Sequence, residues 1–303
     1  MKTITYIAGG IALMSLFACK SHKELKANAA AEFPKFSTEA HRGGRGLMPE
    51  NTIMAMRHAI DLGVTTLEMD THVTGDNEVV VTHDDYLSAQ FNRTPDGKDI
   101  PKSQEMSYVV YKMKYADLRK YDVGSKFNDK FPEQKKVNTY IPRLAELIDS
   151  VQTYIKVNNK KQVFYNIETK CSEKGDGVYN PEPAAFVKLL MDVIIEKKIT
   201  PYVVIQSFDK RTIQLIHQQY PQVRTSYLVS NKKTFEQHLA ELGYKPFIYS
   251  PEYKLVTPEL VKKCHEQQIK IIPWTVNTTA EIEALKALKV DGIITDYPNL
   301  FFN

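Results

Sequence analysis

A regular alternation of short apolar runs and longer amphipathic runs, beginning at residue 37, most limits how this chain can fold. The apolar runs are continuous rather than strictly alternating, which is typical of strands covered on both faces. Strand–helix repeats with short connections favour a parallel sheet, and eight of them favour a closed (β/α)8 TIM barrel. A doubly wound open sheet has the same alternation and is the alternative.

The expected strands and helices fill most of the chain after residue 37. The strands are Thr38–His41, Thr65–Asp70, Gln162–Glu168, Tyr202–Gln206, Arg224–Val229, Phe247–Ser250, Lys270–Thr275 and Gly292–Thr295. The helices between them are Thr52–Leu62, Leu144–Tyr154, Pro183–Lys197, Arg211–Gln219, Lys233–Leu242, Pro258–Gln267 and Ala280–Leu288. Residues 37–303 therefore form one barrel domain, and their number suits this fold.

One segment interrupts the alternation. Between Thr71 and Pro142 the chain has a further strand-like run, Glu78–Thr82, followed by a polar stretch rich in Tyr and Lys. We expect a small insertion over about residues 71–142, directly after the second barrel strand. Within it, Tyr115–Gly124 has the pattern of a short helix closed by a glycine cap.

The first 18 residues have the pattern of a secretory signal. Lys2 precedes an apolar run from Ile4 to Phe17, which is short for a membrane span and suits a signal peptide. The run ends in Leu16-Phe17-Ala18-Cys19, which resembles the lipobox of bacterial lipoproteins. We expect a signal over 1–18, a tether over 19–36 and a lipid on Cys19. The lipid would anchor the protein in the cell envelope, on the periplasmic side or at the outer membrane; an ordinary signal peptide with an incidental cysteine is the alternative.

Composition limits the partners and the cysteine chemistry. The chain is 43% hydrophobic and 25% charged, which is ordinary for a soluble globular protein. Its formal charge is +4, and its basic residues are scattered among nearly as many acids, so no nucleic-acid partner is expected. Besides Cys19, the chain has Cys171 and Cys264. Their places in different parts of the expected fold favour two unpaired thiols over a disulfide.

Three acidic residues lie at the ends of expected strands. Glu68 and Asp70 are two positions apart, so both side chains point the same way from an extended chain. Glu168 ends the next barrel strand, and the carboxyl ends of barrel strands meet at one mouth. Converging carboxylates repel one another and suit a hard divalent cation, Ca²⁺ or Mg²⁺, better than zinc. Separate ion pairs at the barrel rim are the alternative.

Two histidines at strand ends are candidates for proton transfer. A histidine pKa near ~6.5 allows one ring to accept a proton while another donates one, and His41 and His83 would be that pair. Arg42 and Lys170 supply positive charge that could bind a phosphate. His72 is expected to be structural.

Three further residues are candidates for substrate contacts. Helix capping accounts for Asn51 and Thr52, whereas Glu50 could additionally face the site. Gln206 ends an expected strand. Trp274 could form an apolar wall for a small alcohol, with core packing as the alternative.

These motifs resemble the glycerophosphodiester phosphodiesterase family, most closely its periplasmic branch. The matching pieces run in family order from residue 39 to the carboxyl end: His41-Arg-Gly, Pro49-Glu-Asn-Thr, Glu68-x-Asp70, Val80-Val-Thr-His-Asp84, Leu118 to Gly124, Ile141-Pro-Arg-Leu-Ala-Glu146, Asn166-Ile-Glu-Thr-Lys170, Gln206-Ser-Phe, Trp274-Thr-Val-Asn277 and Asp291-Gly-Ile-Ile-Thr-Asp-Tyr-Pro298. The resemblance implies a (β/α)8 barrel with a small insertion, and metal-dependent hydrolysis of glycerophosphodiesters to sn-glycerol 3-phosphate and an alcohol.

The resemblance also implies roles for individual residues. His41 and His83 would be the acid–base pair, and Arg42 and Lys170 would contact phosphate. The metal, typically calcium or magnesium, would be held by Glu68, Asp70 and Glu168. Two other functions remain open: a phospholipase D-like enzyme of the same superfamily acting on lysolipids or sphingolipids, and a non-catalytic lipoprotein that binds phosphodiesters.

Overall fold

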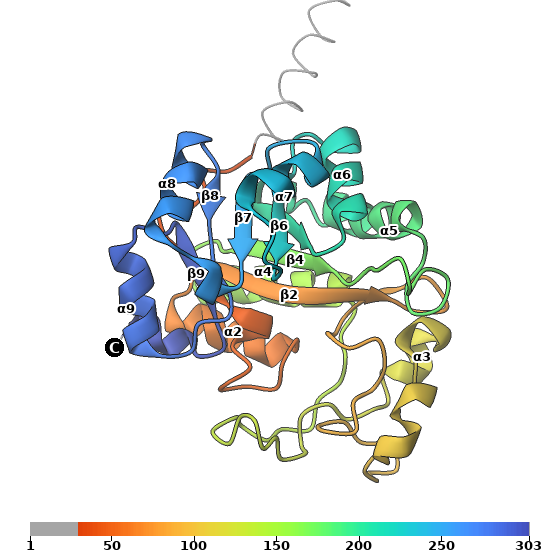
Figure 1. The fold of residues 1–303 in the computed structure, drawn as a ribbon. Coiled ribbons are helices and arrows are strands. Elements are labelled where there is room, and N and C mark those ends of the chain that lie inside the picture. The colour runs from red at the N-terminus through yellow and green to blue at the C-terminus, as the bar shows by residue number, and fades with distance from the viewer. Residues whose placement is uncertain (1–29, 303) are drawn as a thin grey trace, which may run out of the picture.

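Eight parallel strands and one antiparallel strand make up the sheet of this protein, for which a computed structural model describes residues 30–302 (Figure 1). The parallel strands are β1 (Ser37–Ala40), β2 (Thr66–Val73), β4 (Phe164–Thr169), β5 (Val203–Ser207), β6 (Arg224–Val229), β7 (Ile248–Pro251), β8 (Lys270–Ile271) and β9 (Gly292–Thr295). Their order in the sheet is β8-β7-β6-β5-β4-β2-β1-β9.

Backbone hydrogen bonds beyond β8 close this sheet into a barrel. Ile294 of β9 donates its N–H to the carbonyl of Pro273 (3.0 Å), and Val276 donates to the carbonyl of Ile294 (3.0 Å). Closure brings the first and last strands of the order together, which an open doubly wound sheet does not do. The (β/α)8 prediction is confirmed.

A helix follows each of the first seven barrel strands. These helices are α2 (Ile53–Leu62), α4 (Leu144–Val157), α5 (Pro183–Glu196), α6 (Lys210–Gln219), α7 (Phe235–Leu242), α8 (Pro258–Glu266) and α9 (Thr279–Ala287). After β9 the described chain forms only a short 3₁₀ turn, Pro298–Phe301. Every expected strand and helix is present, with shifts at the ends.

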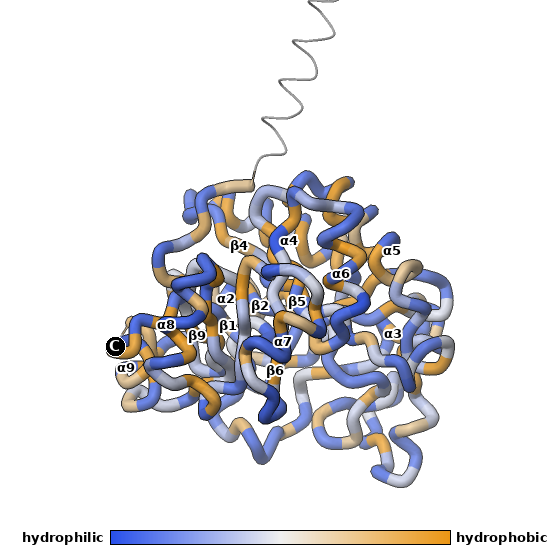
Figure 2. Tube along the Cα trace, turned by 45° about the horizontal axis from the view of Figure 1, so that its top comes forward, coloured by the Kyte–Doolittle hydropathy of each residue, from blue (hydrophilic) through white to orange (hydrophobic). Residues whose placement is uncertain are grey.

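Several helices have sequence features that fix their start or their buried face. Threonines cap α2, α7, α8 and α9, accepting a hydrogen bond from the first turn. Helix α4 buries Leu144, Leu147, Ile148 and Val151, whose spacing places them on one face. Figure 2 shows hydrophobic and hydrophilic residues mixed along the outer helices, as expected of elements with one covered face.

The insertion begins later than expected because β2 continues beyond Asp70. Its last residues pair with the antiparallel strand β3 (Val79–Val81), in the register Thr71 with Val81 and Val73 with Val79. The inserted chain lies at one end of the barrel (Figure 1). It has its own apolar cluster, made up of Val80, Leu87, Ala89, Ile100, Val110, Tyr115, Leu118, Val123 and Ile141.

The expected helix over Tyr115–Gly124 is wrong in its extent. Helix α3 covers only Tyr115–Leu118. Gly124 does not cap it: its N–H donates to the Asp122 carboxylate (3.0 Å), and it packs so closely on the carbonyl of Val137 that a Cβ would have no room. The glycine therefore serves a tight turn in the insertion.

The amino-terminal residues that the structure describes also differ from the expected tether. Phe33 is buried, and its ring packs edge-on against Phe164 and Phe247 at centroid distances of 5.1 and 5.2 Å. Ala31 donates its N–H to the carbonyl of Pro201 (3.0 Å). The last part of the 19–36 segment thus packs over the amino ends of the barrel strands.

The expected signal over 1–18 and Cys19 lie outside the described residues. Between residues 30 and 302, no helix combines the length and the apolar character that a membrane crossing needs. Among the described residues, Cys171 and Cys264 form no disulfide, as predicted.

Candidate active site

The three predicted acidic residues converge at the carboxyl ends of two neighbouring strands. Glu68 and Asp70 lie on β2, and Glu168 lies on β4 in register with Asp70. All three side chains are buried, and one oxygen from each lies within 4.8 Å of the others. The prediction of a cluster is confirmed.

The electrostatics of this cluster favour a bound cation. Burial, together with the charge of Asp70, raises the pKa of Glu68 well above its ordinary value, and burial also raises that of Glu168. Burial alone would raise the pKa of Asp70 too, but the charges of Arg42, His83 and Lys170 hold it below its usual range. A cation among the three acids would relieve this repulsion.

One carboxylate oxygen gives a direct indication of a missing partner. Oδ1 of Asp70 is buried and accepts no hydrogen bond from any described residue. A buried acceptor normally has a partner, since leaving it without one costs free energy. An oxygen-only set of three acids fits Ca²⁺ or Mg²⁺, and Glu68, Asp70 and Glu168 would hold it.

Hydrogen bonds from barrel residues hold the Glu68 carboxylate in a fixed orientation. Its Oε2 accepts from the backbone N–H of Arg42 (2.7 Å), and its Oε1 accepts from Nε2 of Gln206 (2.7 Å). Arg42 has a positive φ of 52°, which turns its N–H toward the acid. Gln206 therefore acts on a predicted metal ligand, besides lining the cavity described below.

Asn51 orients Asp70 by a hydrogen bond. The expected role of Asn51 in capping the helix is therefore wrong. Thr52 is the residue that caps α2, accepting from the N–H of Ala55 (3.2 Å). Asn51 has a positive φ of 58° and instead donates from Nδ2 to Oδ2 of Asp70 (2.9 Å).

The two predicted cationic side chains flank the acids. Nε of Arg42 lies 3.2 Å from Oδ2 of Asp70. Nζ of Lys170 donates to Glu168 (3.1 Å) and lies 3.9 Å from Oδ1 of Asp70, which is too far for a hydrogen bond. Glu50 does not line the cavity; it accepts a hydrogen bond from Nη1 of Arg42 (2.9 Å). Glu50 therefore holds the guanidinium in place.

His41 lies beside the acids and is held by a carboxylate that sequence reasoning missed. Its Nδ1 is 2.6 Å from Oδ1 of Asp296, and its Nε2 is 4.0 Å from Glu68. Burial raises the pKa of Asp296, but the charge and hydrogen bond of His41 outweigh this and hold it below the usual range. An ionised Asp296 only accepts, so Nδ1 of His41 donates to it and Nε2 is left to accept a proton.

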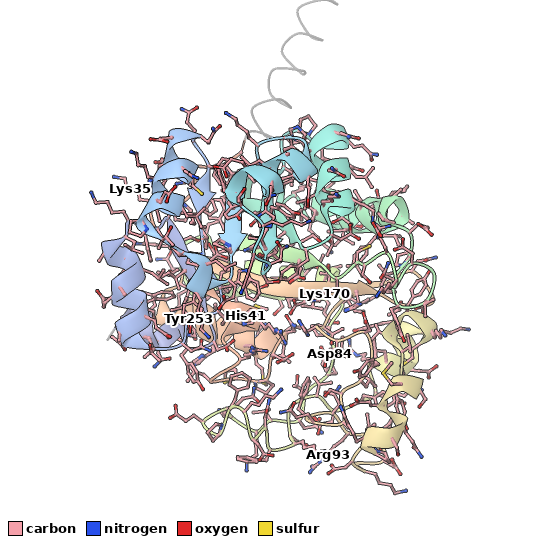
Figure 3. All side chains as sticks on the ribbon, viewed as in Figure 1. Lys35, His41, Asp84, Arg93, Lys170 and Tyr253 are labelled. Carbon is pink, nitrogen blue, oxygen red and sulfur yellow. The ribbon has the colours of Figure 1, made fainter. Side chains whose placement is uncertain are left out.

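His83 approaches the same site from the insertion. Its Nδ1 pairs with Oδ1 of Asp84 (2.7 Å), and its carbonyl lies 3.0 Å from Nε2 of His72. His72 is buried against that backbone, so its predicted structural role fits. Figure 3 shows His41, Lys170 and Asp84 between the barrel and the insertion, and Lys35 on the opposite side of the barrel.

A cavity of about 140 Å³ connects these groups. Its polar wall consists of His41, Arg42, Arg45, Glu68, Asp70, His83, Glu168, Lys170, Gln206 and Thr275. Phe208, Leu228, Trp274 and Ile294 form an apolar wall. Nε1 of Trp274 donates to the carbonyl of Ser250 (2.9 Å), and its ring meets Phe208 edge-on at 5.4 Å, so the indole presents carbon to the cavity.

Comparison with known proteins assigns the family. The sequence profile of the glycerophosphoryl diester phosphodiesterase family matches residues 41–300. This chain belongs to that family.

Relatives in the family match most of the chain. The glycerophosphodiester phosphodiesterase of Bacillus subtilis (strain 168) is 30% identical over 271 residues, 87% of this chain and 84% of the relative. That of Caldanaerobacter subterraneus subsp. tengcongensis is 29% identical over 264 residues, 87% of this chain and 95% of the relative. A solved family structure from Silicibacter pomeroyi DSS-3 has a TM-score of 0.78 at 29% identity, covering 91% of this chain and 94% of that one.

Proposed function

We propose that this protein hydrolyses glycerophosphodiesters to sn-glycerol 3-phosphate and an alcohol, with a divalent cation held by Glu68, Asp70 and Glu168 and with His41 and His83 as the acid–base pair. The observation that carries the proposal is a buried acidic cluster in which one Asp70 oxygen accepts no hydrogen bond from the described residues. This cluster shares one small cavity with both histidines. The activity of the bacterial relatives agrees with it.

His41 is suited to accept a proton. Burial lowers its pKa to about 4, although Asp296 opposes this effect, so the ring is neutral near pH 7. Nδ1 donates to Asp296, which leaves the Nε2 lone pair directed at the site. As the imidazolium forms, the Asp296 carboxylate stabilises it.

His83 is suited to donate a proton to the leaving alcohol. Asp84 lies 2.7 Å from its Nδ1 and holds the ring in place beside the cavity. Its side chain is 29% exposed, which allows it to exchange protons with water after each turnover.

The remaining polar residues bind and orient the phosphodiester. Arg42 and Lys170 line the cavity and can donate to phosphate oxygens, where negative charge increases in the transition state. A bound Ca²⁺ or Mg²⁺ would neutralise charge on the phosphate and polarise its bonds to oxygen. The wall around Trp274 excludes water and packs against the carbon atoms of the substrate.

Product analysis tests the proposal. With glycerophosphocholine, the purified protein with added Ca²⁺ or Mg²⁺ should release sn-glycerol 3-phosphate and choline. His41→Ala and His83→Ala should each lower kcat by on the order of 10²–10⁴-fold, as expected for loss of general acid–base catalysis. His265→Ala is the matched control, because His265 is exposed on α8 and pairs with Asp291 outside the site.

The same experiment separates the other functions. Turnover of lysolipids or sphingolipids in preference to glycerophosphocholine would assign a phospholipase D-like activity. Binding of glycerophosphocholine without turnover, under saturating Ca²⁺ or Mg²⁺, would assign a non-catalytic binding protein. Either result would overturn the proposal.

We also propose that Cys19 carries a lipid that anchors the protein in the bacterial envelope. The support is the sequence Leu16-Phe17-Ala18-Cys19 after an apolar run. The full-length protein expressed in bacteria should incorporate labelled fatty acid and partition into detergent, and Cys19→Ser should do neither. Equal labelling of both proteins would refute the assignment.

A further inference from the structure

We infer that Glu39 is a positioning residue that, through the side chains of Asn166 and Gln206, fixes the orientation of Glu68 in the cation site. Glu39 lies on β1, is fully buried and lines none of the described cavity around the site. The inference rests on the proposed function only in taking Glu68 as a cation ligand.

A continuous series of hydrogen bonds, which we call the relay, joins Glu39 to Glu68. Oε2 of Glu39 accepts from Nδ2 of Asn166 (2.7 Å), and the same nitrogen donates to Oε1 of Gln206 (3.2 Å). Nε2 of Gln206 then donates to Oε1 of Glu68 (2.7 Å). All four side chains are at most 2% exposed.

The relay crosses the inside of the barrel rather than running along adjacent strands. Glu39 is on β1, Asn166 on β4 and Gln206 on β5, whereas the acid that it reaches is on β2, between β1 and β4. Four strands are therefore connected by side chains alone. Within the relay, Gln206 makes the direct contact with a predicted cation ligand, Glu68.

The direction of every bond in the chain is determined by its ends. With a cation bound, Glu68 is ionised, and an ionised carboxylate accepts hydrogen bonds and cannot donate. Gln206 must therefore present its NH₂ group to Glu68, which turns its carbonyl toward Asn166. Asn166 must then present its own NH₂ group, whose two hydrogens serve Gln206 and Glu39.

Without Glu39, no carboxylate fixes the orientation of the Asn166 amide group. An amide side chain can turn by 180° at little cost in shape, exchanging its oxygen and nitrogen. If Asn166 turned, its carbonyl would face the carbonyl of Gln206, and Gln206 would turn in response. Its carbonyl oxygen would then oppose Oε1 of Glu68, and the acid would lose a donor and gain a repulsive contact.

The other oxygen of Glu39 is occupied, which leaves Oε2 for Asn166. Oγ of Ser37 donates to Oε1 of Glu39 (2.9 Å) and lies 2.8 Å from Oγ1 of Thr66. Burial raises the pKa of Glu39 to about 7. In the neutral acid the proton can reside on Oε1, directed at Ser37, so Oε2 accepts from Asn166 in both states.

Calcium binding to the substrate-free protein tests this relay, because it does not depend on turnover. Isothermal titration calorimetry would compare the wild type with Glu39→Leu and with the isosteric Asn166→Asp, which has no N–H to donate. Each should weaken Ca²⁺ binding by about tenfold, the low end of the roughly 10–100-fold effect of residues behind metal ligands. Glu39→Gln retains an accepting oxygen and should bind Ca²⁺ like the wild type.

Two further variants exclude a merely structural effect. Ser37→Ala removes the other hydrogen bond of Glu39 but leaves the relay intact, so Ca²⁺ affinity should be unchanged. In a Gln206→Leu background, Glu39→Leu should cause no further loss, because the relay is already broken. If Glu39→Leu does not fold, the Ca²⁺ affinities of Asn166→Asp and Glu39→Gln still show whether the relay is needed.

The outcomes separate this inference from the proposed function. Wild-type affinity in both Asn166→Asp and Glu39→Leu would overturn the relay and leave the metal assignment intact. An additive loss in the Gln206→Leu background would also overturn it, because Glu39 would then act by another route. Absence of Ca²⁺ and Mg²⁺ binding in the wild type would overturn the metal site and the relay together.

Discussion

Replacing Asp296 by asparagine should reduce the rate of turnover more than it weakens substrate binding. Asp296 accepts from Nδ1 of His41 (2.6 Å), from Nε of Arg45 (2.7 Å) and from Nδ2 of Asn277 (2.8 Å), and it does not line the cavity. Asparagine keeps the shape of the side chain but removes its charge and one of its accepting oxygens. His41 would lose the partner that stabilises its protonated form.

The size of the effect follows from this contact. A hydrogen bond to a charged group contributes roughly 1.5–3 kcal/mol. That contribution is made mainly when His41 becomes an imidazolium in the transition state, so losing it should lower kcat roughly 10- to 100-fold. KM should change less than kcat, because Asp296 lies outside the cavity and reaches it only through His41 and Arg45.

The assay follows release of sn-glycerol 3-phosphate from glycerophosphocholine under saturating Ca²⁺, with circular dichroism to establish folding. Asp291→Asn is a matched control, because Asp291 pairs with the exposed His265 in a second carboxylate–histidine contact (3.0 Å) outside the site. A folded Asp296→Asn enzyme with the wild-type kcat would refute the role given to Asp296. So would an equal loss in Asp291→Asn.

Three further substitutions test the cation site, a buried acid and the core. Glu168→Gln should weaken Ca²⁺ binding, measured by calorimetry, by at least the roughly tenfold typical of residues around metal ligands; unchanged affinity would contradict its role. Burial raises the pKa of Glu39 from 4.5 to about 7, so the folded state binds this proton more tightly than the unfolded state does. As the pH rises from 4.5 to 7, the free energy of unfolding of the wild type should therefore fall by about 3 kcal/mol relative to that of Glu39→Gln. Urea unfolding at several pH values measures this difference, and a difference independent of pH would contradict it. Leu147→Ala should destabilise the fold by about 2–5 kcal/mol in urea, since Leu147 is fully buried on α4, and an unchanged midpoint would show that α4 does not pack as described.

The acidic cluster could be predicted from the sequence because the geometry of parallel strands determines where its residues lie. Residues two apart on a strand share a face, and parallel strands bring their carboxyl ends to the same edge, so Glu68, Asp70 and Glu168 had to converge once the barrel was inferred. The same rule applies to Asp296, which directly follows β9, yet no sequence feature indicated that it would meet His41 at the other end of the chain. Closure of the barrel brings them together.

Other features depended on contacts that no local pattern reports. Asn51 reaches Asp70 because a positive φ turns it away from the helix that its sequence suggests it should cap. The sequence predicts that Phe33 belongs to a polar tether, but its ring packs against Phe164 and Phe247, which are distant in sequence. The sequence predicts that Gln206 contacts substrate and indicates no role for Asn166, and only the contact between them inside the barrel shows that they act together.

The position of a bound metal tests the central claim most directly. Crystals of the protein grown with Mn²⁺, a substitute for Ca²⁺ or Mg²⁺ that scatters anomalously, should show one strong anomalous peak coordinated by oxygens of Glu68, Asp70 and Glu168. A peak elsewhere, or no peak from protein that hydrolyses glycerophosphocholine in the same Mn²⁺ solution, would contradict the account.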